Sequence, residues 1–125
     1  MQIKAKKSLG QNFLIDKNII NKIVDVANIQ PNDNVLEIGP GTGNLTESIL
    51  NKKPKKIYVI EKDERLVKLL SERFKNQIMI INEDILKISE HSISNDELIV
   101  FGNLPYNIST QILSKWIIST YKKKW

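Results

Sequence analysis

Four short apolar runs constrain the fold of this chain more than any other feature. They are rich in β-branched residues and are nearly uninterrupted by polar ones: Asn34–Ile38, Lys56–Ile60, Gln77–Ile81 and Glu97–Phe101. Continuous hydrophobicity, without alternation, is typical of strands that are covered on both faces. Helical patterns lie between the runs. This strand–helix alternation predicts an α/β fold with a mostly parallel sheet.

The expected helices carry apolar residues at helical spacing. They span Asn18–Asn28, Asn44–Leu50, Glu64–Phe74 and Ser109–Ile118. In the first helix we expect one apolar side, formed by Ile19, Ile20, Ile23, Val24 and Ala27. Asp63 is a plausible N-cap for the third helix. The segment 86–96 fits neither pattern.

Polar or glycine residues follow each of the four runs. They are Gly39, Glu61, Asp84 and Asn103, separated by 22, 23 and 19 residues, or about one strand–helix unit each. The carboxyl ends of parallel strands meet at one edge of the sheet, and ligands bind at that edge in open α/β sheets. We therefore expect these four positions to share one site.

The strongest local motif is the glycine-rich segment Glu37–Gly43. Its glycines let the chain turn sharply and let the backbone approach a ligand closely. A dinucleotide-binding fingerprint needs a further glycine three residues after Gly41, where this chain has Asn44. An acidic residue before Gly-x-Gly-x-Gly instead resembles the first motif of S-adenosylmethionine-dependent methyltransferases. The alternative is an ordinary strand–turn–helix corner.

Two carboxylates at strand ends are candidate nucleoside ligands. Glu61 could accept hydrogen bonds from both hydroxyls of a ribose. Its alternative is a solvent-facing acid beside Lys62 and Asp63. Asp84 could accept a hydrogen bond from an adenine amine, and its alternative is a helix N-cap.

The motif Asn103-Leu104-Pro105-Tyr106 carries the most specific chemistry. The exocyclic amine of adenine is a poor nucleophile, because its lone pair is delocalised into the ring. The Asn103 side-chain oxygen and the Leu104 carbonyl could accept its two hydrogens and favour the tetrahedral form. Pro105 would aim that carbonyl, and Tyr106 offers a flat face for an extruded base. The alternative is a proline turn that ends a strand.

Composition narrows the setting of the protein. The formal net charge of +5 suits a polyanionic partner, although a solvated lysine-rich surface explains it nearly as well. There is no cysteine, no membrane-length apolar run and no secretory signal, so we expect a cytoplasmic protein without membrane association. The single histidine, His91, lies in a polar stretch, and we expect no metal site.

In order, the motifs together resemble the ribosomal RNA adenine dimethyltransferase family. The matching segments are Gly10–Leu14, Glu37–Gly43, Val59–Glu61, Asp84 and Asn103–Thr110. The resemblance implies a Rossmann-like class I fold. It also implies that S-adenosylmethionine donates methyl groups to two adjacent adenosines of small-subunit ribosomal RNA. The cofactor residues implied are Asn12, Leu14, Gly39, Gly41, Glu61, Asp84 and Asn103. The residues implied for the target base are Asn103, Leu104, Pro105 and Tyr106.

Relatives that methylate large-subunit RNA and confer macrolide resistance typically differ at two positions. Gly10 and Leu104 favour the small-subunit branch. Members of the family are about twice as long as this chain. We therefore expect residues 1–125 to be a partial N-terminal methyltransferase domain, incomplete at its C-terminus, with the C-terminal helical RNA-contacting domain absent. We expect a monomer that acts on ribosomal RNA in the small subunit. The alternatives are a catalytically silent fragment that binds only cofactor or RNA, the large-subunit activity, and a dinucleotide-dependent oxidoreductase.

Overall fold

The computed structural model describes residues 16–88 and 97–102, which form one parallel sheet and the helices beside it. The helices are α1 (Lys17–Ala27), α2 (Asn44–Asn51) and α3 (Glu64–Phe74), with single 3₁₀ turns η2 (Lys75–Gln77) and η3 (Ile85–Lys87). The strands are β1 (Asn34–Ile38), β2 (Lys56–Ile60), β3 (Met79–Ile81) and β4 (Leu98–Gly102).

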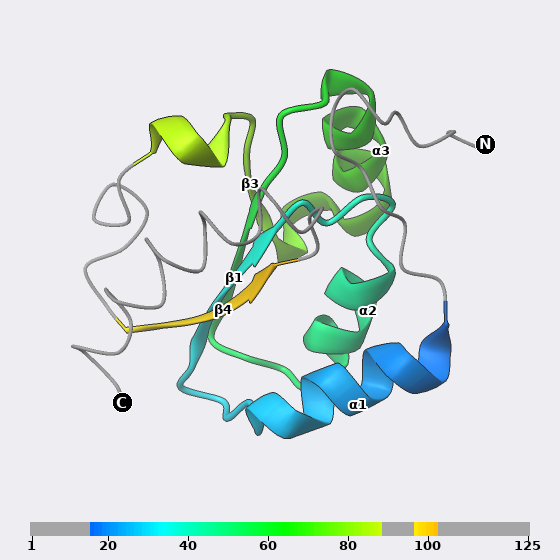
Figure 1. Ribbon diagram of the computed structural model, residues 1–125, viewed down its shortest axis with the longest axis vertical. Coiled ribbons are helices and arrows are strands. Elements are labelled where there is room, and N and C mark those ends of the chain that lie inside the picture. Colours follow the sequence, from blue (N-terminus) through cyan, green and yellow to red (C-terminus); the bar gives the residue numbers. More distant parts are fainter. Residues whose placement is uncertain (1–15, 89–96, 103–125) are drawn as a thin grey trace.

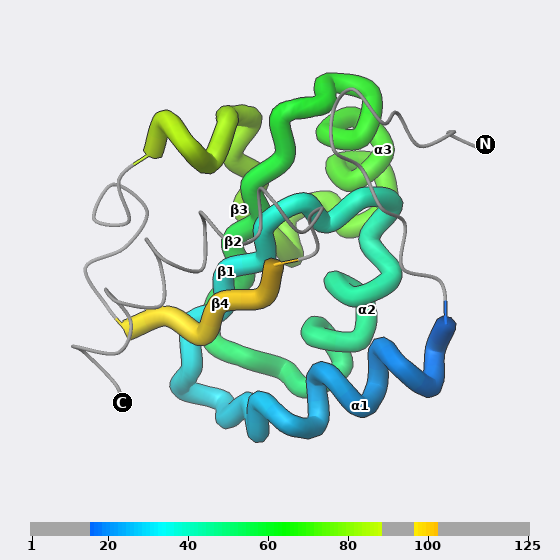
Figure 2. The backbone as a smooth tube through the Cα atoms, viewed as in Figure 1, coloured from blue at the N-terminus to red at the C-terminus, as the bar shows by residue number. Residues whose placement is uncertain are grey.

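The four strands are all parallel and lie in the order β3-β2-β1-β4, as Figure 2 shows. The chain builds outward from β1 through β2 to β3 and then returns to the other side of β1 to form β4. The topological switch point therefore lies between β1 and β4, where open α/β sheets place their ligand crevice. The α/β fold with a mostly parallel sheet is confirmed.

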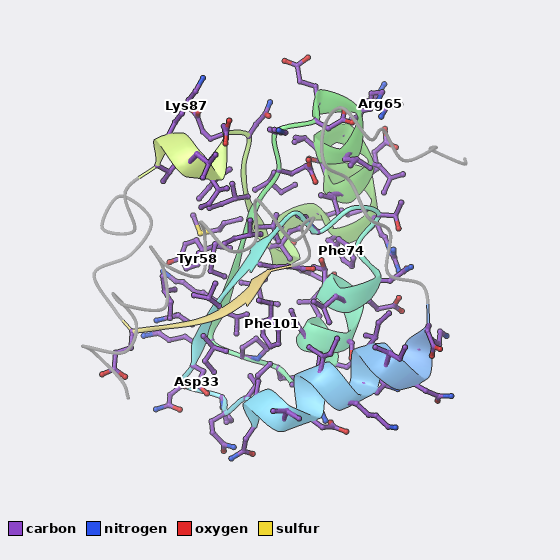
Figure 3. All side chains as sticks on the ribbon, viewed as in Figure 1. Asp33, Tyr58, Arg65, Phe74, Lys87 and Phe101 are labelled. Atoms are coloured by element: carbon purple, nitrogen blue, oxygen red, sulfur yellow. The ribbon has the colours of Figure 1, made fainter. Side chains whose placement is uncertain are left out.

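Two apolar layers hold the sheet. Helices α1, α2 and α3 cover one face, as Figure 1 shows, and pack on Val35, Val59 and Phe101 of the strands. The opposite face contributes Leu36, Ile38, Tyr58, Ile60 and Leu98, which cluster with Ile85 of η3. Figure 3 shows Phe74 and Phe101 on the helical side and Tyr58 on the other side. The two clusters explain why the strands are apolar on both faces.

The strand and helix boundaries agree closely with those expected from the sequence. The bounds of β1, β2 and α3 match, and the Asp63 side chain caps α3 by accepting a hydrogen bond from the Arg65 amide at 2.9 Å. The prediction for β3 began two residues too early, because the chain turns through η2 with Lys75 at a φ of 53°. The helix expected over 109–118 lies outside the described residues.

The predicted apolar side of α1 was too broad. Ile20 and Val24, four residues apart, are buried against the core. Ile19 and Ile23 are 48% and 38% exposed. Helix α1 packs mainly against α2 and buries only a narrow stripe of side chains. Residues one position away from that stripe therefore face solvent.

Gly43 has no room for a side chain. Its φ is 98°, and an added Cβ would stand 2.5 Å from Cε2 of the buried Phe74 ring. Gly43→Ala is therefore expected to lower the free energy of unfolding by about 2 kcal/mol, through backbone strain and displacement of the ring. Urea unfolding of the variant measures this. Thr42→Ala is the neighbouring control, and an equal loss in both variants would contradict the steric argument.

Candidate functional site

The carboxyl edge of the sheet brings two of the predicted site residues together. The parallel ladder continues one residue past β1 and β2, because the Gly39 amide donates to the Ile60 carbonyl and the Glu61 amide donates to the Ile81 carbonyl, each at 3.0 Å. Gly39 and Glu61 are thus neighbours at this edge. The expectation that residues after successive strands share one edge is confirmed for these two positions.

The glycine segment forms a tight turn between β1 and α2. Gly39 and Gly41 have φ angles of 67° and 60°, a region that residues with a Cβ rarely adopt. The Gly43 amide donates to the Pro40 carbonyl at 3.0 Å and closes the turn. The Glu47 amide then donates to the Gly43 carbonyl at 2.9 Å and begins α2. Gly43 has no side chain with which to cap α2, so this helix begins without the side-chain cap that Asp63 gives α3.

Arg73 of α3 clamps this turn from outside the sheet. Its Nη1 donates to the Thr42 carbonyl at 2.7 Å, and its Nη2 pairs with the Glu47 carboxylate of α2. The guanidinium also stands 4.9 Å from the centre of the Phe74 ring. Sequence reasoning missed this contact, since Arg73 and Thr42 lie 31 residues apart and no local motif links them.

Glu61 is buried, with 5% of its surface exposed, so the solvent-facing alternative is wrong. Its Oε2 accepts a hydrogen bond from the Asp63 amide at 3.0 Å. Burial raises the pKa of the Glu61 carboxyl above its usual value, and hydrogen bonding from the backbone of Asp63, Gly41 and Lys62 opposes that rise. A buried carboxylate beside the glycine turn is suited to bind the hydroxyls of a ligand.

Glu37 is a second buried acid, which the sequence analysis did not assign to the site. It is fully buried at the end of β1, and its Oε1 accepts a hydrogen bond from the hydroxyl of Thr46, which is also fully buried on α2. Its Oε2 has no hydrogen-bond partner in the part of the chain that the structure describes. Burial, with a further contribution from Glu61, raises the pKa of Glu37 to about 7, against the lowering effect of Thr46. An acid inside an otherwise apolar strand was the sequence signal that pointed to it.

Asp84 follows β3 at the same edge. Its Oδ1 accepts a hydrogen bond from the Leu86 amide at 3.0 Å and caps η3. The capping alternative raised from the sequence is therefore confirmed. One oxygen of a carboxylate in a cap does not exclude a second interaction, so contact with an adenine amine stays a prediction.

The remaining predicted site residues lie outside the described residues. They are Asn12, Leu14, Asn103, Leu104, Pro105 and Tyr106. Strand β4 ends at Gly102, which pairs with Ile38 beside the glycine turn. The described part of β4 thus ends at the same edge of the sheet, next to the switch point.

Neither a metal-binding cluster nor a membrane-spanning helix is found among the described residues. Within 16–88 and 97–102, no group of three or more His, Cys, Asp or Glu side chains is arranged to hold a metal ion. No helix in the same part of the chain is long and apolar enough to cross a membrane.

Comparison with known proteins gives a consistent result. The family model for ribosomal RNA adenine dimethylase matches residues 2–124. Ribosomal RNA small subunit methyltransferase A of Pelagibacter ubique is 62% identical over 125 residues, covering 100% of this chain and 47% of that protein. The protein of the same name from Staphylococcus carnosus is 47% identical over 120 residues, covering 90% of this chain and 40% of that protein.

Two solved structures align with this chain over most of its length. The 23S rRNA methyltransferase ErmE aligns with a TM-score of 0.76 and 31% identity, covering 87% of this chain and 43% of that one. A dimethyladenosine transferase from Plasmodium falciparum aligns with a TM-score of 0.73 and 32% identity, covering 86% of this chain and 38% of that one. Both alignments support a Rossmann-like methyltransferase fold.

Proposed function

The chain belongs to the ribosomal RNA adenine dimethylase family, and from this premise we propose that it binds S-adenosylmethionine. We further propose that the complete protein transfers methyl groups to the exocyclic amines of two adjacent adenosines in small-subunit ribosomal RNA. The chain spans less than half the length of the curated relatives that it matches. It carries the glycine turn, Glu61 and the Asn103–Tyr106 motif of the proposed site.

One observation carries the proposal: the left-handed glycine turn stands at the switch point, directly beside a buried carboxylate. The φ angles of Gly39 and Gly41 favour glycine at these two positions, and Glu61 is only 5% exposed. Two positions without a Cβ beside a buried acceptor fit a nucleoside that carries an amino-acid chain. The residues present therefore suit S-adenosylmethionine.

Each part of the cofactor has a matching group in this arrangement. Glu61 is placed to accept hydrogen bonds from the ribose hydroxyls, since it lies at the end of β2. The backbone of Gly39 and Gly41 permits close approach of the methionine portion. The start of α2, at the positive end of the helix dipole, favours the methionine carboxylate. Asp84, Asn12 and Leu14 complete the proposed pocket.

The cofactor supplies an electrophilic methyl group on a positively charged sulfur. The chain's own residues act on the acceptor. Asn103 and the Leu104 carbonyl hold the two amine hydrogens and stabilise the charge that develops at nitrogen. Pro105 sets the direction of that carbonyl, and Tyr106 stacks on the extruded base. The loss of a proton from the methylated ammonium needs no strong base.

Two ribosomal substrates can be distinguished by experiment. Gly10 and Leu104, together with the names of the curated relatives, favour the small subunit. The fold similarity to a 23S rRNA methyltransferase keeps the large subunit as the second candidate. Labelled methyl transfer by the complete protein to unmodified small subunits, and not to large-subunit RNA, is the expected result. Transfer only to large-subunit RNA would reverse the assignment. We place this activity in the cytoplasm, where the ribosomal substrate is found.

The cofactor assignment predicts a loss of binding when Glu61 is replaced. Glu61→Ala is expected to weaken binding of S-adenosylhomocysteine by about 1–3 kcal/mol, the range for a lost hydrogen bond to a charged group. Calorimetry measures this, and Glu64→Ala is a matched control because Glu64 is an exposed acid three residues away. Unchanged affinity in a folded Glu61→Ala variant would remove Glu61 from the site.

The same titration tests the competing cofactor class. NAD also has ribose hydroxyls, but Asn44 stands where a dinucleotide fingerprint needs glycine. Binding of S-adenosylhomocysteine without binding of NAD is expected. The opposite preference would support an oxidoreductase.

A further inference from the structure

Glu37 is the buried ionisable group for which the proposed chemistry has no use. Its Oε2 is enclosed without a hydrogen-bond partner among the described residues, and its Oε1 is bound to Thr46. Leaving a buried carboxylate oxygen unpaired is costly, and such an atom in a folded protein requires an explanation. If Glu37 served only to link β1 to α2, one oxygen bound to the Thr46 hydroxyl would be enough. A glutamine or an apolar residue at position 37 would avoid the cost of burying an ionisable group.

The position of Glu37 relates it to the glycine turn. It lies two residues before Gly39 on β1, and Thr46 is the third residue of α2, so the pair closes the base of the turn that these two elements enclose. It shares the helix-covered face of the sheet with Val35 and Val59. Glu61, two positions beyond Val59, lies on this same face and contributes electrostatically to Glu37. The carboxyl of Glu37 is therefore buried beneath the glycine turn and is within electrostatic reach of Glu61.

Within residues 16–88 and 97–102, the charged group that acts on Glu37 is another acid. Among the described residues packed around it, the ionisable group that acts on it is Glu61 from the end of β2, and this effect is unfavourable to a second negative charge. Thr46 from α2 contributes a neutral hydroxyl, and the neighbouring residue on β4, Phe101, is apolar. Arg73 of α3 is engaged with Thr42 and Glu47. Glu37 therefore keeps its proton up to about pH 7, and a cation placed nearby would favour its ionised form.

S-adenosylmethionine and its product differ in one respect that such a group can detect. The donor carries a sulfonium and a net charge of +1, whereas the demethylated product has a neutral sulfur. Resting on the proposed function, we propose that Glu37 is a positioning residue that makes the pocket prefer the cationic donor over the neutral product. As the donor binds, the Glu37 carboxyl releases its proton to solvent, and the resulting carboxylate faces the added positive charge. Once the methyl group has been transferred, this attraction disappears and release of the product is favoured.

The proposal predicts proton release that depends on the charge of the ligand. A carboxyl with a pKa of about 7 is half protonated at that pH, so donor binding by the complete protein should release up to roughly half a proton near pH 7. Calorimetry in buffers of different ionisation enthalpy measures this number. S-adenosylhomocysteine should release less. An analogue with a protonated amine in place of the sulfonium should behave like the donor.

Variants at Glu37 and at Thr46 test the contribution of each residue to this proton release. Glu37→Gln keeps the shape of the side chain and should abolish the difference in proton release between donor and product. Thr46→Val removes a hydrogen bond that lowers the pKa of Glu37, so the pH at which donor affinity increases should move upward. Thr46→Ser retains the hydroxyl and should leave that pH unchanged. In the wild type, donor affinity should increase about tenfold for each unit by which binding lowers the pKa of Glu37.

The outcomes also separate this inference from the function on which it rests. Glu61 contacts a ribose that both ligands share, so protons released through Glu61 would appear equally with donor and product. Equal proton release for the two ligands, or an unchanged difference in Glu37→Gln, would overturn the role of Glu37 while leaving cofactor binding intact. Absence of any donor binding by the wild-type protein would instead overturn the proposed function.

Discussion

Replacing Asn103 by alanine is expected to lower the rate of methyl transfer by about a hundredfold or more, the usual effect of losing a preorganised acceptor in the transition state. Asn103 is proposed to act as the target amine becomes tetrahedral, when its hydrogens turn toward the side-chain oxygen. The interaction is weaker in the ground state, where the amine is planar. The rate should therefore fall far more than the affinity for RNA.

The measurement is single-turnover transfer of labelled methyl groups by the complete protein to small subunits that lack the modification. Saturating S-adenosylmethionine is required, because Asn103 is also assigned to the cofactor and a binding defect would imitate a chemical one. Tyr106→Ala provides the contrast, since the loss of stacking should weaken base capture by about 1–3 kcal/mol, and Tyr106→Phe should be mild. If folded Asn103→Ala transferred methyl groups at the wild-type rate, the alternative interpretation of the motif, a proline turn that ends a strand, would be favoured.

The second large effect concerns the dependence of stability on pH. Folding raises the pKa of Glu37 from 4.5 to about 7, so the folded state binds its proton more tightly than the unfolded state does. The corresponding stabilisation is complete below the unfolded pKa and is lost as the pH rises through the folded pKa. Between about pH 4.5 and about pH 8, this one group should lower the free energy of unfolding by roughly 3 kcal/mol.

Other carboxylates titrate in the lower part of this range, so the quantity to compare is the difference between wild type and Glu37→Gln. Glutamine cannot ionise, and the variant should lack the decrease above about pH 6. Urea unfolding of the complete protein across this pH range, without ligand, gives the difference. If the free energy of unfolding depended on pH in the same way in both proteins, folding would not raise the pKa of Glu37.

The sequence predicted those parts of the molecule that depend on local patterns. Strands β1 and β2 could be located to the residue, because continuous apolar runs end sharply at Gly39 and Glu61. That Gly39 and Glu61 are neighbours could be predicted because each directly follows one of two parallel strands. Strand β3 was located less well, since the η2 turn contains ordinary polar residues that carry no strong turn signal.

The contacts between distant segments could not be predicted in this way. The clamp of Arg73 on Thr42 and the pairing of Glu37 with Thr46 depend on how α2 and α3 pack on the sheet. The burial of Glu61 likewise follows from packing, which overrode the polar character of the neighbouring Lys62, Asp63 and Glu64. Sequence patterns identified which residues reach the edge of the sheet, and only the packing set their charge and partners.

The strand order also fixes when the site can form in a growing polypeptide. Strands β1 and β2 can pair as soon as residue 60 has been made, and β3 can join once residue 81 has been made. The partner on the other side of β1 arrives only with residues 98–102. Joining Asn34 to Leu98 closes a far longer loop than joining Asn34 to Lys56, with a correspondingly larger entropy cost. Among the four described strands, the switch point between β1 and β4 is therefore assembled last, after the glycine turn and Glu61 already stand side by side.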